Sequence, residues 1–155
     1  TRRVMAAAET TPDRPFPWRV VGPAGDVART DDGWEVAPDA LRELLLRLHR
    51  HYPDTPLMIT ENGAVTGESP THDGLVHDAR RESYLLAHLC AVADAIDGGA
   101  DIRGYLHWSL LDNFEWSRGY RPRFGLVYVD YPTGKRTVKE SARVYSRIAA
   151  TGVLP

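Results

Sequence analysis

Two acidic residues and two tryptophans follow apolar stretches of this 155-residue chain in a pattern suited to carbohydrate chemistry. Glu61 comes directly after the apolar run Leu57–Thr60, and Trp108, Glu115 and Trp116 fall within nine residues after a second such run. A carboxylate at the carboxyl end of a buried strand can act as a nucleophile or a base. An indole ring stacks on the apolar face of a sugar, and a carboxylate accepts hydrogen bonds from its hydroxyls.

Each of these residues also has a purely structural interpretation. Glu61 can be a solvated loop residue or a helix cap, and both Trp108 and Trp116 can pack in a hydrophobic core. The residue types alone leave the two interpretations open, so the choice depends on the elements that position these side chains.

Other kinds of chemistry find no support in the chain. The six histidines show no metal-ligand spacing, and the glycines form no phosphate-binding motif. We therefore expect no metal and no cofactor.

Composition and charge exclude several classes of protein. With 43% hydrophobic and 26% charged residues the chain is typical of globular proteins, which excludes disordered and fibrous structure. No run approaches the ~18 apolar residues of a membrane-spanning helix. The net charge of −2 provides no basic surface, so we expect neither a nucleic-acid nor a membrane partner. The single cysteine, Cys90, excludes an internal disulfide; we expect a buried thiol and a cytoplasmic location.

Hydrophobic spacing predicts alternating helices and strands after residue 33. Prolines and glycines interrupt residues 1–33 repeatedly, which predicts a long loop. Leucines spaced as on one helix face predict a helix over 41–48, and a similar pattern predicts a second over 85–96, with Asp78 as its N-cap and Gly98 and Gly99 ending it.

The remaining expected elements are strands and one last helix. Leu57–Thr60, Arg103–Trp108 and Leu126–Val129 are expected to be strands, with a turn at 132–134. Thr137 and Glu140 have the spacing of a capping box at the start of the last helix. Such alternation indicates parallel βαβ units. Two core strands cannot form a parallel sheet that is covered on both faces, so we expect a further part on the N-terminal side.

Several longer strings resemble glycoside hydrolase family 1, the β-glucosidase family, and occur in its order. They are TDDGWEVAPDAL at 30–41, PLMITENGA at 56–64, GYLHWSLLDNFEWSRGY at 104–120, RFGLVYVDY at 123–131 and KRTVKESARVY at 135–145. The string at 56–64 resembles the nucleophile motif of that family, and the string at 104–120 resembles its glycone-binding segment.

The resemblance implies an α/β fold, the C-terminal part of a (β/α)8 TIM barrel. Leu57–Thr60 and Arg103–Trp108 would be its seventh and eighth strands, with flanking helices. Residues 34–155 would form the C-terminal segment of a single barrel, and 1–33 the loop that precedes it.

The resemblance also implies roles for five side chains. Glu61 would be the nucleophile of a retaining β-glycosidase and Trp108 the platform under the sugar. Glu115 would hold sugar hydroxyls with both oxygens, Trp116 would add a hydrogen bond, and Phe124 would form a wall of the same pocket. The presence of Glu115 and Trp116 resembles the pattern of family members that act on unphosphorylated sugars.

The second carboxylate of a retaining glycosidase is expected outside this chain. In the family the acid/base is a Glu in a Thr-x-Asn-Glu-Pro-type motif, and no such string occurs here. A barrel of this kind takes about 250 residues. We therefore expect a carbohydrate substrate, a partner in the N-terminal remainder of the barrel, and no activity of the isolated chain.

Three alternatives remain open at this point. The chain can be a sugar-binding module without catalysis, an assembly fragment, or part of an enzyme that transfers the glycosyl group to an acceptor other than water. Two departures from the family pattern, Glu82 and Val138, stand where an apolar residue and a proline are usual.

Overall fold

The computed structural model of the chain describes residues 3–6, 10–12, 15–22 and 25–155, which divide into two compact units, Thr1–Val36 and Ala37–Pro155. In the first unit β1 (Arg3–Ala6) pairs antiparallel with β2 (Trp18–Val21). The rings of Phe16 and Trp18 stack with their centroids 5.3 Å apart. The stretch predicted as a long loop therefore contains a two-stranded sheet.

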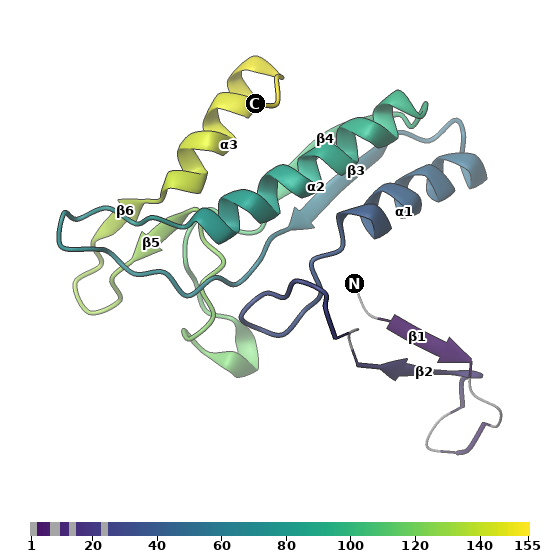
Figure 1. Cartoon of the computed structure of the whole chain (residues 1–155), viewed down its shortest axis with the longest axis horizontal. Helices are drawn as coiled ribbons and strands as arrows, with labels where there is room; N and C mark the ends of the chain where they lie inside the picture. Colours follow the sequence, from purple (N-terminus) through teal and green to yellow (C-terminus); the bar gives the residue numbers. More distant parts are fainter. Residues whose placement is uncertain (1–2, 7–9, 13–14, 23–24) are drawn as a thin grey trace. The chain divides into compact units, whose positions relative to one another are not determined.

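The second unit is built around one parallel pair of strands (Figure 1). β3 (Leu57–Asn62) pairs parallel with β4 (Ile102–His107), and α2 (Ala79–Asp97) connects them. α1 (Pro38–His51) precedes β3, and α3 (Glu140–Thr151) follows β4. The predicted parallel βαβ unit is confirmed.

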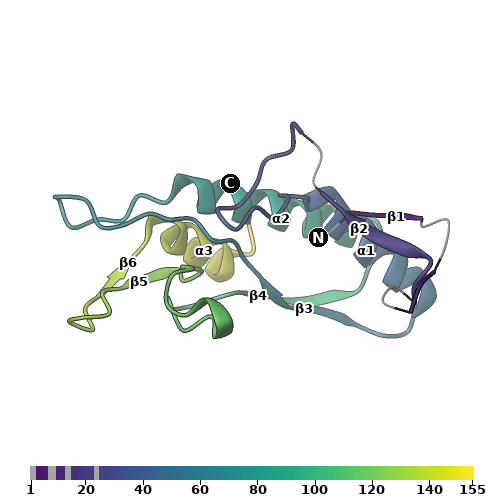
Figure 2. The same ribbon diagram turned by 90° about the horizontal axis from the view of Figure 1, so that it is seen from below.

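The hydrophobic core lies on one side of this strand pair. Leu45 of α1, Ile59 of β3 and Val92 of α2 are buried together. Ile59 points to the face of the strand pair that the helices cover, because alternate residues of a strand point to opposite faces. Figure 2 shows α2 and α3 on the same side of β3 and β4. On the opposite face Met58 and Leu106 are 57% and 52% exposed, so this face of the sheet is uncovered.

The strand and turn expected after β4 form part of a short hairpin. β5 (Val127–Val129) pairs antiparallel with β6 (Arg136–Val138), and the chain turns at 130–135 between them. The predicted capping box is wrong: Thr137 belongs to β6, and α3 starts at Glu140 with Lys139 at its N-cap position and no side-chain cap. Pairing with β5 thus takes Thr137 out of helical geometry.

The expected burial of Cys90 is also wrong, since its side chain is exposed. Cys90 shares a face of α2 with Ser83, Asp94 and Asp97, all of them exposed. The buried residues Leu85, Leu89 and Val92 lie on another face of the same helix.

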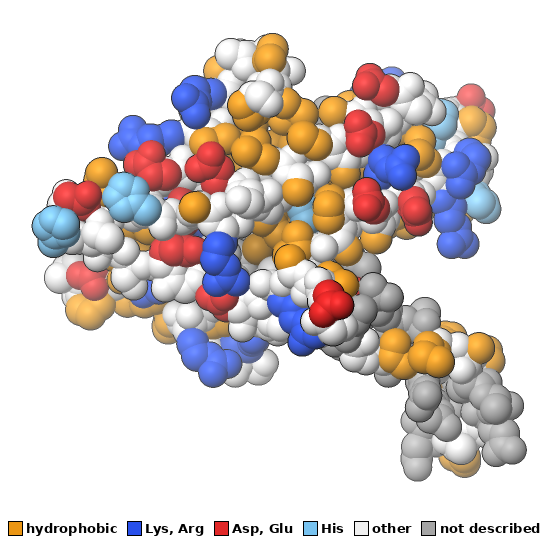
Figure 3. Space-filling view, in the orientation of Figure 1, with side chains coloured by type: hydrophobic (Ala, Val, Ile, Leu, Met, Phe, Trp, Pro, Cys, Tyr) orange, Lys and Arg blue, Asp and Glu red, His pale blue; other side chains and the backbone are white. Residues whose placement is uncertain are grey.

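The surface carries charges of both signs. In Figure 3 blue and red side chains are interspersed on the visible face, and hydrophobic groups gather between α3 and α2. Among the described residues no helix combines the length and apolar character needed to cross a membrane.

The uncovered sheet face predicts a weakly cooperative isolated chain. We expect the 155-residue chain to bind 8-anilinonaphthalene-1-sulfonate and to melt over a broad temperature range, because parallel sheets are stable when both faces are covered. Replacing Met58 and Leu106 by Lys should reduce dye fluorescence at least twofold, since both are exposed apolar groups of this face. The control Val153→Lys, at an exposed position in the C-terminal tail, should leave it unchanged. A sharp melt without dye binding would contradict this expectation.

Candidate active site

The carboxyl ends of β3 and β4 bring the first two predicted site residues to one edge of the sheet. Glu61 is the penultimate residue of β3, and its side chain is exposed. Asn62 is the register partner of His107, and the backbone N–H of Trp108 donates to the carbonyl oxygen of Asn62 at 2.9 Å. The strand thus runs two residues further than predicted, and Glu61 is a strand residue rather than a loop residue or a helix cap.

Two tyrosines hold the residue next to Glu61. The Tyr105 hydroxyl donates to Oδ1 of Asn62 at 2.7 Å, and Nδ2 of Asn62 donates to the Tyr84 hydroxyl oxygen at 3.4 Å. Burial raises the pKa of both tyrosines, so both hydroxyls remain protonated. The Tyr145 hydroxyl of α3 donates to the Tyr105 carbonyl oxygen at 3.0 Å, which ties this end of the sheet to the helices.

Gly63 permits the close approach of the two strand ends. A Cβ atom on this residue would lie 1.7 Å from the carbonyl oxygen of Trp108. Any side chain here would force the segment after Glu61 away from Trp108, so the absence of a Cβ sets the separation of the two strand ends.

A loop after β4 carries the other polar site residues. The indole Nε1–H of Trp108 donates to Oε1 of Glu115 at 3.2 Å. Trp116 begins η1 (Trp116–Arg118), a single 3₁₀ turn, and is 83% exposed. Trp108 is 36% exposed. The alternative that both tryptophans pack in a core is therefore excluded for Trp116, and Trp108 directs Glu115 by a hydrogen bond.

Phe124 lies beside this loop but is only 5% exposed. The backbone N–H of Ser109 donates to the Phe124 carbonyl oxygen at 3.2 Å, and the N–H of Leu126 donates to the Ser109 carbonyl oxygen at 2.8 Å. The segment after Phe124 thus runs alongside the segment after Trp108, and the two support each other.

Asp112 is the buried centre of this loop and was not among the residues predicted for the site. Its Oδ1 accepts hydrogen bonds from the Gly125 N–H at 2.9 Å and from Nζ of Lys139 at 3.2 Å. Its Oδ2 accepts one from Nη1 of Arg123 at 2.7 Å. Burial and the charge of Arg81 lower the pKa of Lys139 to about 8, and Asp112 opposes this change. The feature of the sequence that could have indicated Asp112 is its position among the aromatic residues of 104–120.

The aromatic residues of the hairpin hold Arg123 against Asp112. The guanidinium carbon lies 4.2 Å from the ring centroid of Tyr128 and 4.7 Å from that of Tyr131. Both distances are typical of cation–π contacts. Tyr131 in turn packs on Tyr120, with ring centroids 4.6 Å apart, which extends the support to the far end of the loop.

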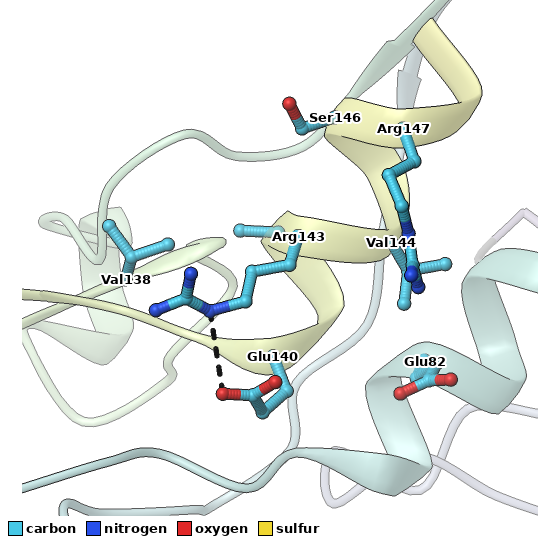
Figure 4. Close-up of a pocket in the computed structure, with 8 residues that line it drawn as sticks. Glu82, Val138, Glu140, Arg143, Val144, Ser146 and Arg147 are labelled. Carbon is cyan, nitrogen blue, oxygen red and sulfur yellow. Dashed lines mark ion pairs between the residues drawn. The ribbon is translucent and has the colours of Figure 1, made fainter. Parts of the chain in front are cut away.

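A separate cavity of about 530 Å³ lies on the surface of α3 (Figure 4). Glu82, Val138 and Arg147 are among its lining residues, and Nε of Arg143 pairs with Oε1 of Glu140 at 3.5 Å. The two departures from the family pattern, Glu82 and Val138, therefore meet at this cavity and do not belong to the predicted site. Within the described part of the chain, no group of three or more His, Cys, Asp and Glu side chains is arranged to hold a metal.

Comparison with known proteins identifies the family. The sequence model of Glycosyl hydrolase family 1 matches residues 7–153. The chain belongs to glycosyl hydrolase family 1. Its relatives include the β-glucosidase of an Agrobacterium strain, 46% identical over 95% of this chain, and a 6-phospho-β-galactosidase of Lacticaseibacillus rhamnosus, 43% identical over 86%.

Solved structures of family 1 enzymes match the fold. The psychrophilic β-glucosidase of Micrococcus antarcticus superimposes with a TM-score of 0.83 at 48% identity over 91% of this chain and 30% of its own. The family 1 β-glucosidase of Thermotoga maritima gives 0.86 at 42% identity, covering 91% and 31% of the two chains. These enzymes are TIM barrels. The chain spans about a third of the length of its relatives; it covers 32% of the Agrobacterium enzyme.

The close approach at Gly63 predicts a large effect of one added methyl group. The test protein is a chimeric enzyme, in which the part of the Agrobacterium β-glucosidase that precedes the aligned region is joined to this chain. With Glu61 as the predicted nucleophile, Gly63→Ala should lower its kcat/KM for an aryl β-glucoside roughly 10²-fold, because displacing that carboxylate by about 1 Å costs this much. Gly25→Ala is the control, since a Cβ there meets nothing within 4 Å. Equal activity of the two variants would refute this role of Gly63.

The burial of His107 leads us to expect that the folded state becomes less stable in mild acid. Burial, reinforced by the charge of Arg81, lowers the pKa of His107 from 6.5 to about 4. Between pH 6.5 and pH 4 His107 binds a proton in the unfolded chain but not in the folded chain. The contribution of neutral His107 to the free energy of unfolding is therefore complete above pH 6.5 and is lost as the pH falls toward 4.

For the chimeric enzyme this effect amounts to about 2 kcal/mol between pH 7 and pH 5. The free energy of unfolding, measured with urea at both pH values, should lose this part of its pH dependence in His107→Phe. His72→Asn, at an exposed position, should retain it. The same pH dependence in both variants would show that His107 does not hold a lowered pKa.

Proposed function

We propose that this chain supplies the nucleophile and the glycone-binding groups of a retaining β-glycosidase. The observation that carries the proposal is the joint position of Glu61 and Trp108 at the paired ends of β3 and β4, linked through the Asn62 carbonyl. In a (β/α)8 barrel this edge is where the active site lies. In this proposal β3 and β4 are the seventh and eighth strands of that barrel.

The reaction has two steps and uses two carboxyl groups. Glu61 is the nucleophile, and the second group is the general acid in the first step and the general base in the second. A Glu61 oxygen attacks the anomeric carbon while the bond to the leaving oxygen breaks, and a second carboxylic acid protonates that oxygen. The same second group then removes a proton from water, which attacks the anomeric carbon and releases Glu61. The two carboxyl groups must stand about 5–5.5 Å apart. The acid/base belongs to the part of the barrel that corresponds to the first two thirds of the relatives.

The loop after β4 provides the glycone site in this proposal. Trp108 stacks on the sugar face, and Phe124 closes the pocket from behind. Glu115 accepts hydrogen bonds from two adjacent hydroxyls, with one oxygen oriented by the Trp108 indole at 3.2 Å, and Trp116 donates a further one. The Glu115 carboxylate repels a phosphate, which favours unphosphorylated sugars even though the relatives include 6-phospho-β-galactosidases.

Covalent labelling tests the assignment of Glu61. Incubation of the chimeric enzyme with 2,4-dinitrophenyl 2-deoxy-2-fluoro-β-glucoside should trap a glycosyl ester, since fluorine slows both steps and the good leaving group favours the first. Peptide mapping by mass spectrometry should place the ester on Glu61. Glu61→Gln should lose labelling and reduce kcat by about 10⁴-fold or more, as expected when a nucleophile is removed.

Two further samples separate this proposal from its alternatives. The isolated 155-residue chain should show no turnover, because it lacks the acid/base. It should also show no labelling, because most of the barrel that would hold the sugar against Glu61 is missing. The 6-phosphorylated form of the same glucoside should label the chimeric enzyme at least tenfold more slowly. A label on a residue other than Glu61, or turnover by the isolated chain, would overturn the proposal.

A further inference from the structure

Arg81 is a fully buried arginine that none of the steps above uses. It lies in the first turn of α2, and its Nε–H donates to Oδ2 of Asp78 at 2.9 Å. Oδ1 of Asp78 accepts a hydrogen bond from the backbone N–H of Ser141, at the start of α3, at 2.9 Å. One edge of the guanidinium is therefore anchored to the helices.

The other donors of Arg81 reach the backbone that follows Glu61. Nη1 donates to the Ala64 carbonyl oxygen at 2.5 Å, and Nη2 donates to the Thr66 carbonyl oxygen at 3.2 Å. Ala64 and Thr66 are both buried. Without a partner these carbonyl oxygens would pay a desolvation penalty, so the arginine holds this segment in place.

The same two nitrogens also hold the segment that follows Glu115 and Trp116. Nη1 donates to the Phe124 carbonyl oxygen at 3.1 Å, and Nη2 donates to the Arg123 carbonyl oxygen at 3.0 Å. One rigid guanidinium thus bonds two backbone segments that are far apart in the sequence.

Only arginine has the donors for this arrangement. Its planar group carries five N–H donors in a fixed fork, and each has an acceptor here. A lysine ammonium offers three donors from a single atom and cannot span acceptors on both sides. Burial lowers the pKa of Arg81, whereas Asp78 and Glu68, whose Oε2 is 3.9 Å from Nη2, favour its charged form.

We infer that Arg81 is a positioning residue that fixes the nucleophile segment relative to the glycone-binding loop. This inference rests on the proposed function of Glu61. The four carbonyl oxygens that Arg81 binds through its Nη atoms belong to residues 64, 66, 123 and 124, on both sides of the site. Loss of the fork lets these two segments move apart, which displaces Glu61 from the sugar held on Trp108.

The test compares Arg81→Lys with a variant that is destabilised elsewhere on the same helix. In the chimeric enzyme Arg81→Lys should lower the rate constant for labelling of Glu61 by the fluoroglucoside roughly 10²-fold, measured well below the melting temperature. Leu85→Ala is the matched control, because Leu85 is fully buried one turn further along α2 and holds neither segment. It should lower the melting temperature to a similar degree and change the labelling rate less than threefold.

Three results would overturn the inference. The first is an Arg81→Lys enzyme that labels within threefold of the unmodified one, and the second is an equal loss of labelling in Leu85→Ala. If Arg81→Lys does not fold, Asp78→Asn replaces it, since this change weakens the anchor of the guanidinium while Arg81 remains. The third result is then a labelling rate of Asp78→Asn that falls less than tenfold. Absence of labelling on Glu61 in the unmodified chimeric enzyme refutes the proposed function itself and is seen before any variant is made.

Discussion

The parallel pairing of β3 with β4 is the constraint on which the rest of this structure depends. Carboxyl ends of parallel strands meet at one edge, so this pairing brings Glu61 and Trp108 together although they lie 47 positions apart in the chain (108 minus 61). At the carboxyl end of the pair the Trp108 N–H bonds the Asn62 carbonyl oxygen, and Gly63 leaves room for this approach. A side chain at Gly63 would separate the two strand ends and with them the site.

Buried charges support the loops that leave this edge. Asp112 joins Arg123 and Lys139 beneath the loop that carries Glu115, and Arg81 joins Asp78 to the backbone on both sides of the site. Burying an ion costs several kcal/mol unless its hydrogen bonds are satisfied, so these groups are sensitive to the loss of a single partner. The loops of the site therefore have definite positions although they contain little regular secondary structure.

The three helices, the two parallel strands and their order follow from the spacing of apolar residues. Local patterns failed where a tertiary contact outweighs them. Thr137 has the spacing of a helix cap but pairs in β6. Asp78 is the N-cap residue of α2 as predicted, but its carboxylate bonds Arg81 and Ser141 and makes no side-chain cap bond. Cys90 lies among apolar neighbours in the sequence but faces away from the core. The pairing of Thr137 and the bond of Asp78 to Ser141 depend on partners distant in the chain, which periodicity does not reveal, whereas the exposure of Cys90 follows from the face of α2 on which it lies.

The sequence by itself determined the family of this protein and the residue types of its site, because long motifs around Glu61 and Trp108 occur in the order of the family. Only the tertiary structure decided how these residues are held. The tyrosine pair on Asn62 and four of the five bonds of Arg81 join segments that are separate in the sequence. The hydrogen bond from Trp108 to Glu115 lies within one motif, but only the fold shows it. The physical reason is that local propensity sets a helix or strand within a few residues, whereas burial of a charged group is settled by whichever partners the fold brings to it.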